Sequence, residues 1–90
     1  MLYVEGLKDY VIIRTEQSKV ITLQTMKSLE EKLPTHQFLR IHRSFIINLD
    51  RIHALATGSV EIMEKGQLKT IPVGANYKDI LEQLIHSKRL

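Results

Sequence analysis

The feature that most constrains the fold is residues 38–52, in which two short apolar runs enclose a polar cluster. The segment reads FLRIHRSFIINLDRI, and the cluster contains two arginines, a histidine and a serine. Apolar runs this short and this rich in Ile and Phe are typical of β-strands. A strand pair with basic residues at its junction presents them outward on a rigid support. The segment therefore predicts two strands joined at an exposed basic turn.

Alternation along the first of these strands predicts where its side chains point. Successive side chains of a strand face opposite sides, so Leu39 and Ile41 share one face. Arg40 and His42 share the other face. By the same count Arg43 falls on the apolar side, where its charge would be buried. A turn at His42–Arg43 avoids that burial and projects Arg43 outward.

The rest of the apolar pattern predicts further short strands and two helices. The strands are expected over residues 2–4, 10–13, 20–23, 60–62 and 68–73. The last two flank EKGQ, which is typical of a hairpin with Gly66 in its turn. These elements predict one mainly β domain over residues 1–90, a β-rich α+β fold with an internal and a C-terminal helix.

The internal helix is expected over residues 25–33 and the second from Tyr77 onward. The apolar face of the internal helix consists of Met26, Leu29 and Leu33, and Pro34 marks its end. The C-terminal helix has its apolar face at Ile80, Leu81, Leu84 and Ile85. Asn76 is well placed to cap this second helix.

Composition narrows the class of protein. With 43% hydrophobic and 26% charged residues, the 90-residue chain suits an ordered globular domain. The absence of cysteine excludes disulfides and zinc–thiolate sites, and is compatible with a reducing compartment. The sequence contains no apolar run of about 18 residues and no signal-peptide pattern. We expect a soluble cytoplasmic protein without membrane contact in this chain.

The positive charge is concentrated in one part of the chain. The net charge is +3, and residues 34–53 hold three arginines against one aspartate. The same segment contains three of the four histidines. A basic focus is the electrostatic footprint expected for phosphate binding. On charge alone, a solvated basic edge is the favoured explanation.

Catalytic and metal-binding patterns are missing from the sequence. His36, His42 and His53 are not spaced like the ligands of a helical or finger zinc site. The chain has no Gly-rich phosphate loop, nucleophile elbow or HExxH pattern. The adjacent Glu30 and Glu31 fit a solvated helix face. We expect no enzyme activity and no cofactor.

The 38–52 segment resembles the central signature of the LytTR DNA-binding domain family. Matching positions are occupied by Arg40, His42, Arg43, Ser44 and Asn48. The opening strand–loop–strand of the family is resembled by LYVEGLKDYVIIRT. Its internal helix is resembled by TLQTMKSLEEKLP, and its closing strand-to-helix segment by IPVGANYKDIL. These segments follow the family's order over nearly all 90 residues.

The resemblance implies an elongated arrangement of small stacked antiparallel β-sheets with DNA-binding loops along one side. It also implies a response-regulator effector domain that binds duplex DNA, at paired direct repeats as two protomers, after an upstream receiver or sensor domain. Most family members have another strand before the position of Leu2, so we expect a trimmed domain here.

Within this resemblance, Arg43 is expected to contact base edges in a major groove and Arg40 to contact phosphates. Arginine presents a planar donor fork that matches guanine or a phosphate. Two alternatives remain open. Both arginines fit solvated positions on an exposed strand, and Arg40 fits an ion pair with a nearby carboxylate.

The neighbours of these arginines have more than one possible role. His42 and Ser44 can donate to phosphate oxygens, although a histidine at a strand end is often a structural hydrogen-bonding group. Asn48 is expected to form a turn by capping backbone groups.

Two further loops correspond to contact regions of the family. In the loop at residues 6–9, Lys8 can bind a phosphate and Asp9 can accept from cytosine N4, unless the loop is an ordinary polar turn. In the second region, Gly74 and Ala75 replace the Ser and Arg of many members. Ala75 leaves only apolar contact with a thymine methyl, whereas Asn76 and Lys78 can still bind phosphate.

The alternative to DNA binding is a β-rich protein-interaction module whose basic surface meets an acidic partner. Such a surface should expose aromatic residues beside the basic cluster. Phe38 and Phe45 are close to it, but alternation can place both in the core.

Overall fold

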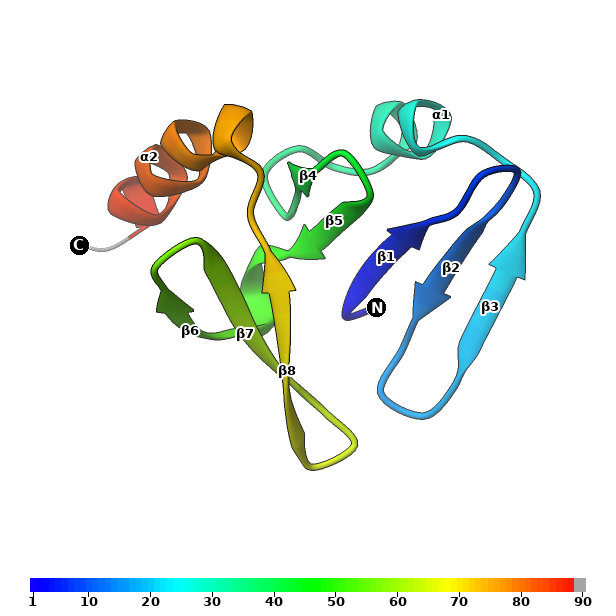
Figure 1. Ribbon diagram of the computed structural model, residues 1–90, viewed down its shortest axis with the longest axis horizontal. Coiled ribbons are helices and arrows are strands. Elements are labelled where there is room, and N and C mark those ends of the chain that lie inside the picture. Colours follow the sequence, from blue (N-terminus) through cyan, green and yellow to red (C-terminus); the bar gives the residue numbers. More distant parts are fainter. Residues whose placement is uncertain (89–90) are drawn as a thin grey trace.

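The first five strands pair into one antiparallel sheet in the computed structural model, which describes residues 1–88 and the side chains of residues 1–84. They are β1 (Tyr3–Gly6), β2 (Val11–Arg14), β3 (Lys19–Thr22), β4 (Phe38–His42) and β5 (Phe45–Asn48). Their spatial order is β3-β2-β1-β5-β4 (Figure 1). The strand pair predicted in residues 38–52 is thus confirmed, and it lies beside the first strand of the chain.

The next three strands form a second antiparallel sheet. A short 3-10 helix, η1 (Leu49–Arg51), leads into β6 (Ile52–Ala56), β7 (Ser59–Glu64) and β8 (Gln67–Pro72). The predicted hairpin between β7 and β8 is confirmed. Lys65 and Gly66 form its turn with φ values of 52° and 78°. Positive φ at both turn residues matches the right-handed twist of the strands, and glycine adopts it without strain.

Two α-helices complete the predicted β-rich fold. Helix α1 (Met26–Lys32) begins where the Thr25 side chain accepts a hydrogen bond from Ser28 N, at 3.0 Å. Helix α2 (Lys78–Lys88) continues directly from a 3-10 turn, η2 (Ala75–Tyr77). Neither helix is long and apolar enough to cross a membrane over the described residues.

Two predictions about α2 are wrong. Asn76 lies inside η2, whose N-cap is Gly74 and has no side-chain hydrogen bond, because the chain begins to turn before Asn76. Ile80 is half exposed, whereas Leu81 is buried. Successive helical residues are 100° apart, so a helix that contacts the sheets along Leu81 leaves Ile80 outside the contact. The side chain of Ile85 lies outside the described residues.

The two faces of the five-stranded sheet are buried by different partners. Val4 and Ile46 pack with Met26 and Leu29 of α1 on one face. The other face packs on the second sheet and α2, in a core of Leu2, Tyr3, Ile41, Ile47, Leu49, Val60, Ile62, Ile71 and Leu81. Because neighbouring residues of a strand face opposite sides, β1 and β5 contribute to both cores.

Polar side chains fix the segment that links the two sheets and form a direct bond between them. Asn48 donates from Nδ2 to Met1 O at 2.8 Å and accepts from Asp50 N at 3.0 Å. Its predicted role as a turn-former is confirmed, and both ends of its amide are satisfied. The Tyr3 hydroxyl donates to Glu64 Oε1 across the sheets at 3.5 Å. Burial, with a contribution from Glu64, raises the pKa of Tyr3 to about 12.

Replacing Leu81 with Ala should lower the free energy of unfolding by about 2–4 kcal/mol, because it opens a cavity in a small core. Ile80→Ala is the matched control on the same helix, since Ile80 is 50% exposed. Chemical denaturation measures both. Equal losses for the two variants would mean that α2 does not pack through Leu81.

Stability should fall between about pH 10 and pH 12 because of Tyr3. A raised pKa in the folded state stabilises the fold below the unfolded pKa of 10.0, and that stabilisation is lost as the pH rises towards 12. The loss attributable to this group is on the order of 2 kcal/mol. Tyr3→Phe should flatten the alkaline decline measured by thermal denaturation. Tyr10→Phe, at an exposed tyrosine, should leave it unchanged.

Candidate nucleic-acid interface

Three connections between elements lie along the upper edge of the molecule in Figure 1. They are the β1–β2 loop (residues 7–10), the β4–β5 turn (residues 43–44) and the β8–α2 connection (residues 73–77). Two backbone hydrogen bonds at or next to their ends bring them together. Gly6 N donates to Ser44 O at 2.7 Å, and Gly74 N donates to Ile41 O at 2.7 Å. The β4–β5 turn is therefore held between the other two connections.

The β4–β5 turn presents Arg43 to solvent. The strand pairing shifts register between Arg40 and His42, and the two-residue turn follows at Arg43–Ser44, one residue later than predicted. The predicted outward projection of Arg43 is confirmed, because the residue is exposed. Its side chain has no hydrogen bond or ion pair to the side chains described through residue 84. All its donors remain available to a ligand.

His42 has a structural role within this turn. Its Nδ1 accepts a hydrogen bond from Ser44 N at 3.1 Å, and its ring meets Phe45 edge-on at a centroid distance of 5.5 Å. An accepting Nδ1 requires the neutral ring with its proton on Nε2. His42 therefore acts as a structural hydrogen-bonding group, and its Nε2–H remains as the donor of the ring.

Arg40 faces α1 because it shares strand parity with Phe38, which packs on the α1 side of the sheet. Its NH1 donates to Glu30 Oε1 at 3.2 Å, within an ion pair. Its Nε donates to His42 O at 3.4 Å and its NH2 to Arg43 O at 2.6 Å. The ion pair left open as an alternative is therefore what forms, and phosphate contact by Arg40 stays a prediction.

Glu30 was predicted to lie on a solvated helix face, and it is exposed there, but its ion pair was not predicted. It is paired with Arg40, with 45% of its side chain exposed. Sequence reasoning missed this residue because the contact depends on how α1 packs over the sheet. The sequence signal for this contact was that Arg40 and Phe38 lie two residues apart on one strand and therefore face the same side of the sheet.

The β1–β2 loop lies close to both the turn and α1. Lys8 and Asp9 are exposed. Lys8 and Arg43 line the same shallow recess, together with Met26. Met26 packs so closely over Gly6 that a Cβ at Gly6 would lie 2.5 Å from Met26 Cγ. Glycine at this position thus allows α1 to sit against the base of the loop.

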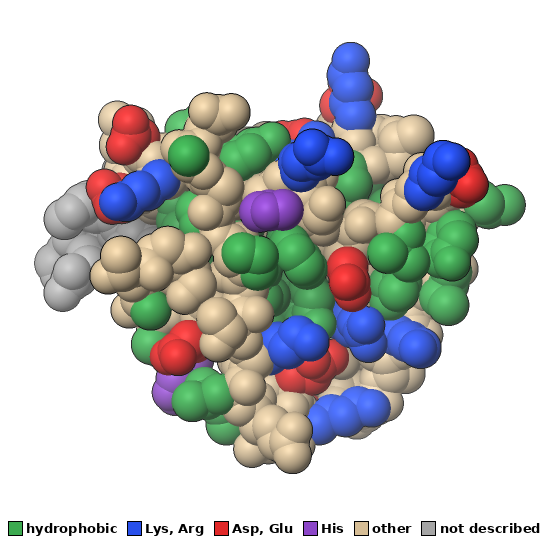
Figure 2. All heavy atoms as spheres, viewed as in Figure 1, with side chains coloured by type: hydrophobic (Ala, Val, Ile, Leu, Met, Phe, Trp, Pro, Cys, Tyr) green, Lys and Arg blue, Asp and Glu red, His purple; other side chains and the backbone are tan. Residues whose placement is uncertain are grey.

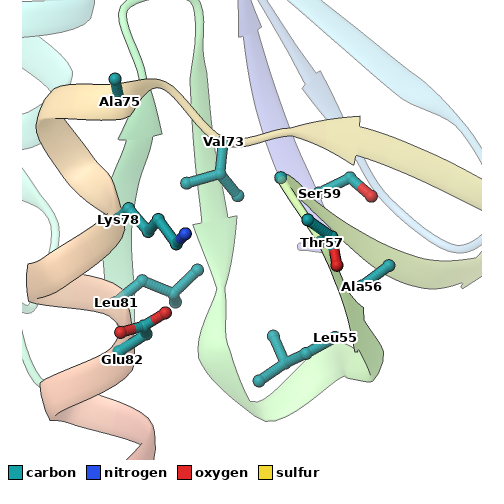
Figure 3. A pocket seen from close by; sticks show the side chains of 10 residues that line it. Leu55, Ala56, Thr57, Ser59, Val73, Ala75, Lys78, Leu81 and Glu82 are labelled. Atoms are coloured by element: carbon teal, nitrogen blue, oxygen red, sulfur yellow. The ribbon is translucent and has the colours of Figure 1, made fainter.

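The β8–α2 connection contributes fewer polar groups. Ala75 and Asn76 are exposed, and a Cβ at Gly74 would lie 3.7 Å from His42 Cα, so this connection runs close to the turn. Lys78 extends from α2 into a recess that is also lined by Val73, Leu81 and residues of the β6–β7 turn (Figure 3). Lys78 is exposed, and a phosphate contact by it stays a prediction.

The charge of this edge is mixed. Figure 2 shows Lys and Arg side chains along the upper edge with acidic side chains among them. The charge of Arg40, in β4, is compensated by Glu30. Within the three connections, Lys8 and Arg43 are the cationic residues, and neither has an ion pair among the side chains of residues 1–84. No group of three His, Cys, Asp or Glu side chains in the described residues is arranged to hold a metal ion.

The family model described as the LytTr DNA-binding domain matches residues 1–86. The chain belongs to the LytTR family. This assigns it to a class of DNA-binding domains rather than to a class of enzymes.

Several curated proteins contain a similar LytTR domain. The sensory transduction protein LytT of Bacillus anthracis is 32% identical over 90 residues, which covers 94% of this chain and 35% of that protein. LytT of Bacillus subtilis is 31% identical over 85 residues, covering 90% and 35%. The CO-responsive transcriptional regulator RcoM of Rhodospirillum rubrum is 29% identical over 77 residues, covering 82% and 33%. The chain spans about a third of the length of these relatives.

A solved structure supports the fold independently. The LytTr DNA-binding domain of a Bacillus cereus protein superposes with a TM-score of 0.74 and 23% sequence identity. The match covers 93% of this chain and 79% of that one. The two sheets and their helices are thus arranged as in a LytTR domain.

Proposed function

We propose that this LytTR domain recognises specific duplex DNA sequences by inserting its edge connections into grooves, as the DNA-binding part of a bacterial transcription regulator. The observation that carries the proposal is the state of Arg43. It is exposed on a two-residue turn and has no intramolecular side-chain partner within the described residues. An arginine in this state can donate two parallel hydrogen bonds to guanine O6 and N7 in a major groove.

The groups around Arg43 are suited to bind the DNA backbone. We assign phosphate contacts to Lys8, Arg40, His42 through Nε2–H, Ser44, Asn76 and Lys78. Asp9 is assigned to a cytosine N4 amino group, the base-edge donor that suits a carboxylate. Phosphate contacts fix the position of a protein on DNA without selecting a sequence, so specificity would rest mainly on Arg43.

The relatives suggest the setting in which the domain acts. Their printed names refer to sensory transduction and to a CO-responsive transcriptional regulator, and each is about three times as long as the matched region. We infer that the full protein is a cytoplasmic regulator with an upstream receiver or sensor domain. We further infer that two protomers bind paired direct repeats.

The protein-interaction alternative receives less support. It called for exposed aromatic side chains near the basic cluster. Phe38 packs against the core under α1, and Phe45 packs against the core between the sheets. Neither phenylalanine beside the basic turn is exposed, which favours DNA as its ligand, although Tyr10 in the β1–β2 loop is exposed.

Arg43→Ala should weaken binding to a preferred duplex by about 1–3 kcal/mol, with little loss on a scrambled duplex, because it removes a contact with base edges. The preferred duplex comes from selection with the wild-type domain out of a random library. Lys69→Ala removes one exposed positive charge from β8 and is the control. Titrations at matched salt concentration measure both variants on both duplexes.

Equal losses on the two duplexes for a folded Arg43→Ala variant would remove Arg43 as a specificity residue. Failure of the wild type to bind any duplex at low salt would contradict DNA binding itself, because phosphate contacts are strongest there. That second result would favour the protein-interaction alternative.

A further inference from the structure

We propose that Glu30 and Arg40 are positioning residues that aim Arg43 at the DNA. This inference rests on the proposed function, in which Arg43 contacts base edges. Arg40 holds the β4–β5 turn through hydrogen bonds within the protein. Glu30, on α1, holds the guanidinium of Arg40 in the orientation required for that.

The two carbonyl groups bonded by Arg40 lie on either side of Arg43. His42 O belongs to the peptide group that precedes the Arg43 Cα, and Arg43 O belongs to the one that follows it. Peptide groups are planar, so the backbone at Arg43 has only the freedom of rotation about its φ and ψ bonds. Holding both peptide planes fixes these rotations, and with them the direction in which the Arg43 side chain leaves the turn.

The third bond of Arg40 connects this arrangement to the core. Glu30 accepts from Arg40 NH1, and its neighbour Leu29 is buried under the sheet. A guanidinium is a rigid planar fork, so fixing one of its nitrogens restricts the other two. With 19% of its side chain exposed, Arg40 is partly shielded from water. The orientation of Arg43 thus depends on α1, a helix that is not one of the three connections.

Apart from this positioning role, the negative charge of Glu30 is unfavourable for DNA binding. A carboxylate near a DNA-binding edge repels phosphates, so simple charge arguments predict that its removal strengthens binding to every duplex. The positioning role predicts a different result, namely a smaller preference for the selected duplex over the scrambled one. The two effects are separable because only the second changes the ratio of affinities.

The test compares Glu30→Ala with Glu31→Ala in this 90-residue chain. Glu31 is the next residue of α1, is exposed, and has no ion pair among the described side chains. Each variant removes one negative charge from the same helix. Since exposed ion pairs are weak, we expect Glu30→Ala to lower the preferred-to-scrambled affinity ratio by about two- to fivefold. Glu31→Ala should leave the ratio unchanged.

A double variant shows whether Glu30 acts through Arg43. If it does, adding Glu30→Ala to Arg43→Ala should produce no further change in the affinity ratio. Amide hydrogen exchange without DNA supplies a second readout. The Ser44 N–H, which is bonded to His42, should exchange faster in Glu30→Ala than in Glu31→Ala.

The outcomes separate this inference from the function on which it rests. Equal affinity ratios for Glu30→Ala and Glu31→Ala, with Arg43→Ala still losing preference, would overturn the positioning role and leave the proposed function intact. An additive effect in the double variant would overturn it as well. A wild-type domain that shows no preference for any duplex would overturn both.

Discussion

Strand alternation in the β4–β5 hairpin sends apolar side chains to both faces of the five-stranded sheet, and the rest of the structure depends on this double burial. Ile46 packs under α1, while Ile41 and Ile47 pack against the second sheet. A hairpin covered on both faces is rigid, because close-packed interiors resist small displacements. Its turn is the one part that emerges from this packing, and Arg43 lies in it.

The hairpin also organises its neighbours. Ser44 accepts a hydrogen bond from Gly6 at the base of the β1–β2 loop, and Ile41 accepts one from Gly74 at the start of η2. Three segments that are far apart in the sequence thus become one edge. Both bonds join backbone atoms, so they do not depend on the side chains of Ser44 and Ile41.

Much of the fold was predictable from local patterns, because each of those patterns is settled by near neighbours. The strands around the basic turn, the β7–β8 hairpin and the capping by Asn48 depend on alternation, turn residues and short side-chain bonds. The exposure of Arg43 followed from the cost of burying its charge. In each case the deciding interaction lies within a few residues of the group concerned.

The features that the sequence did not predict have a common physical cause, which is packing between distant segments. The partner of Arg40 is Glu30, which becomes its neighbour only when α1 lies on the sheet. The exposure of Ile80 depends on where α2 contacts the second sheet. Asn76 lost its capping role because the chain turns early, at Gly74, next to His42. No spacing rule within the sequence contains these contacts.

The central claim is that the three connections form one continuous DNA-binding edge around Arg43. It is tested most directly by following the backbone amide NMR signals of the domain while a selected duplex is added. We expect the largest changes together at residues 7–9, 43–44 and 74–76, with little change at Lys65 and Gly66 in the distant β7–β8 turn. Changes centred on the β7–β8 turn, or restricted to one of the three connections, would contradict the account.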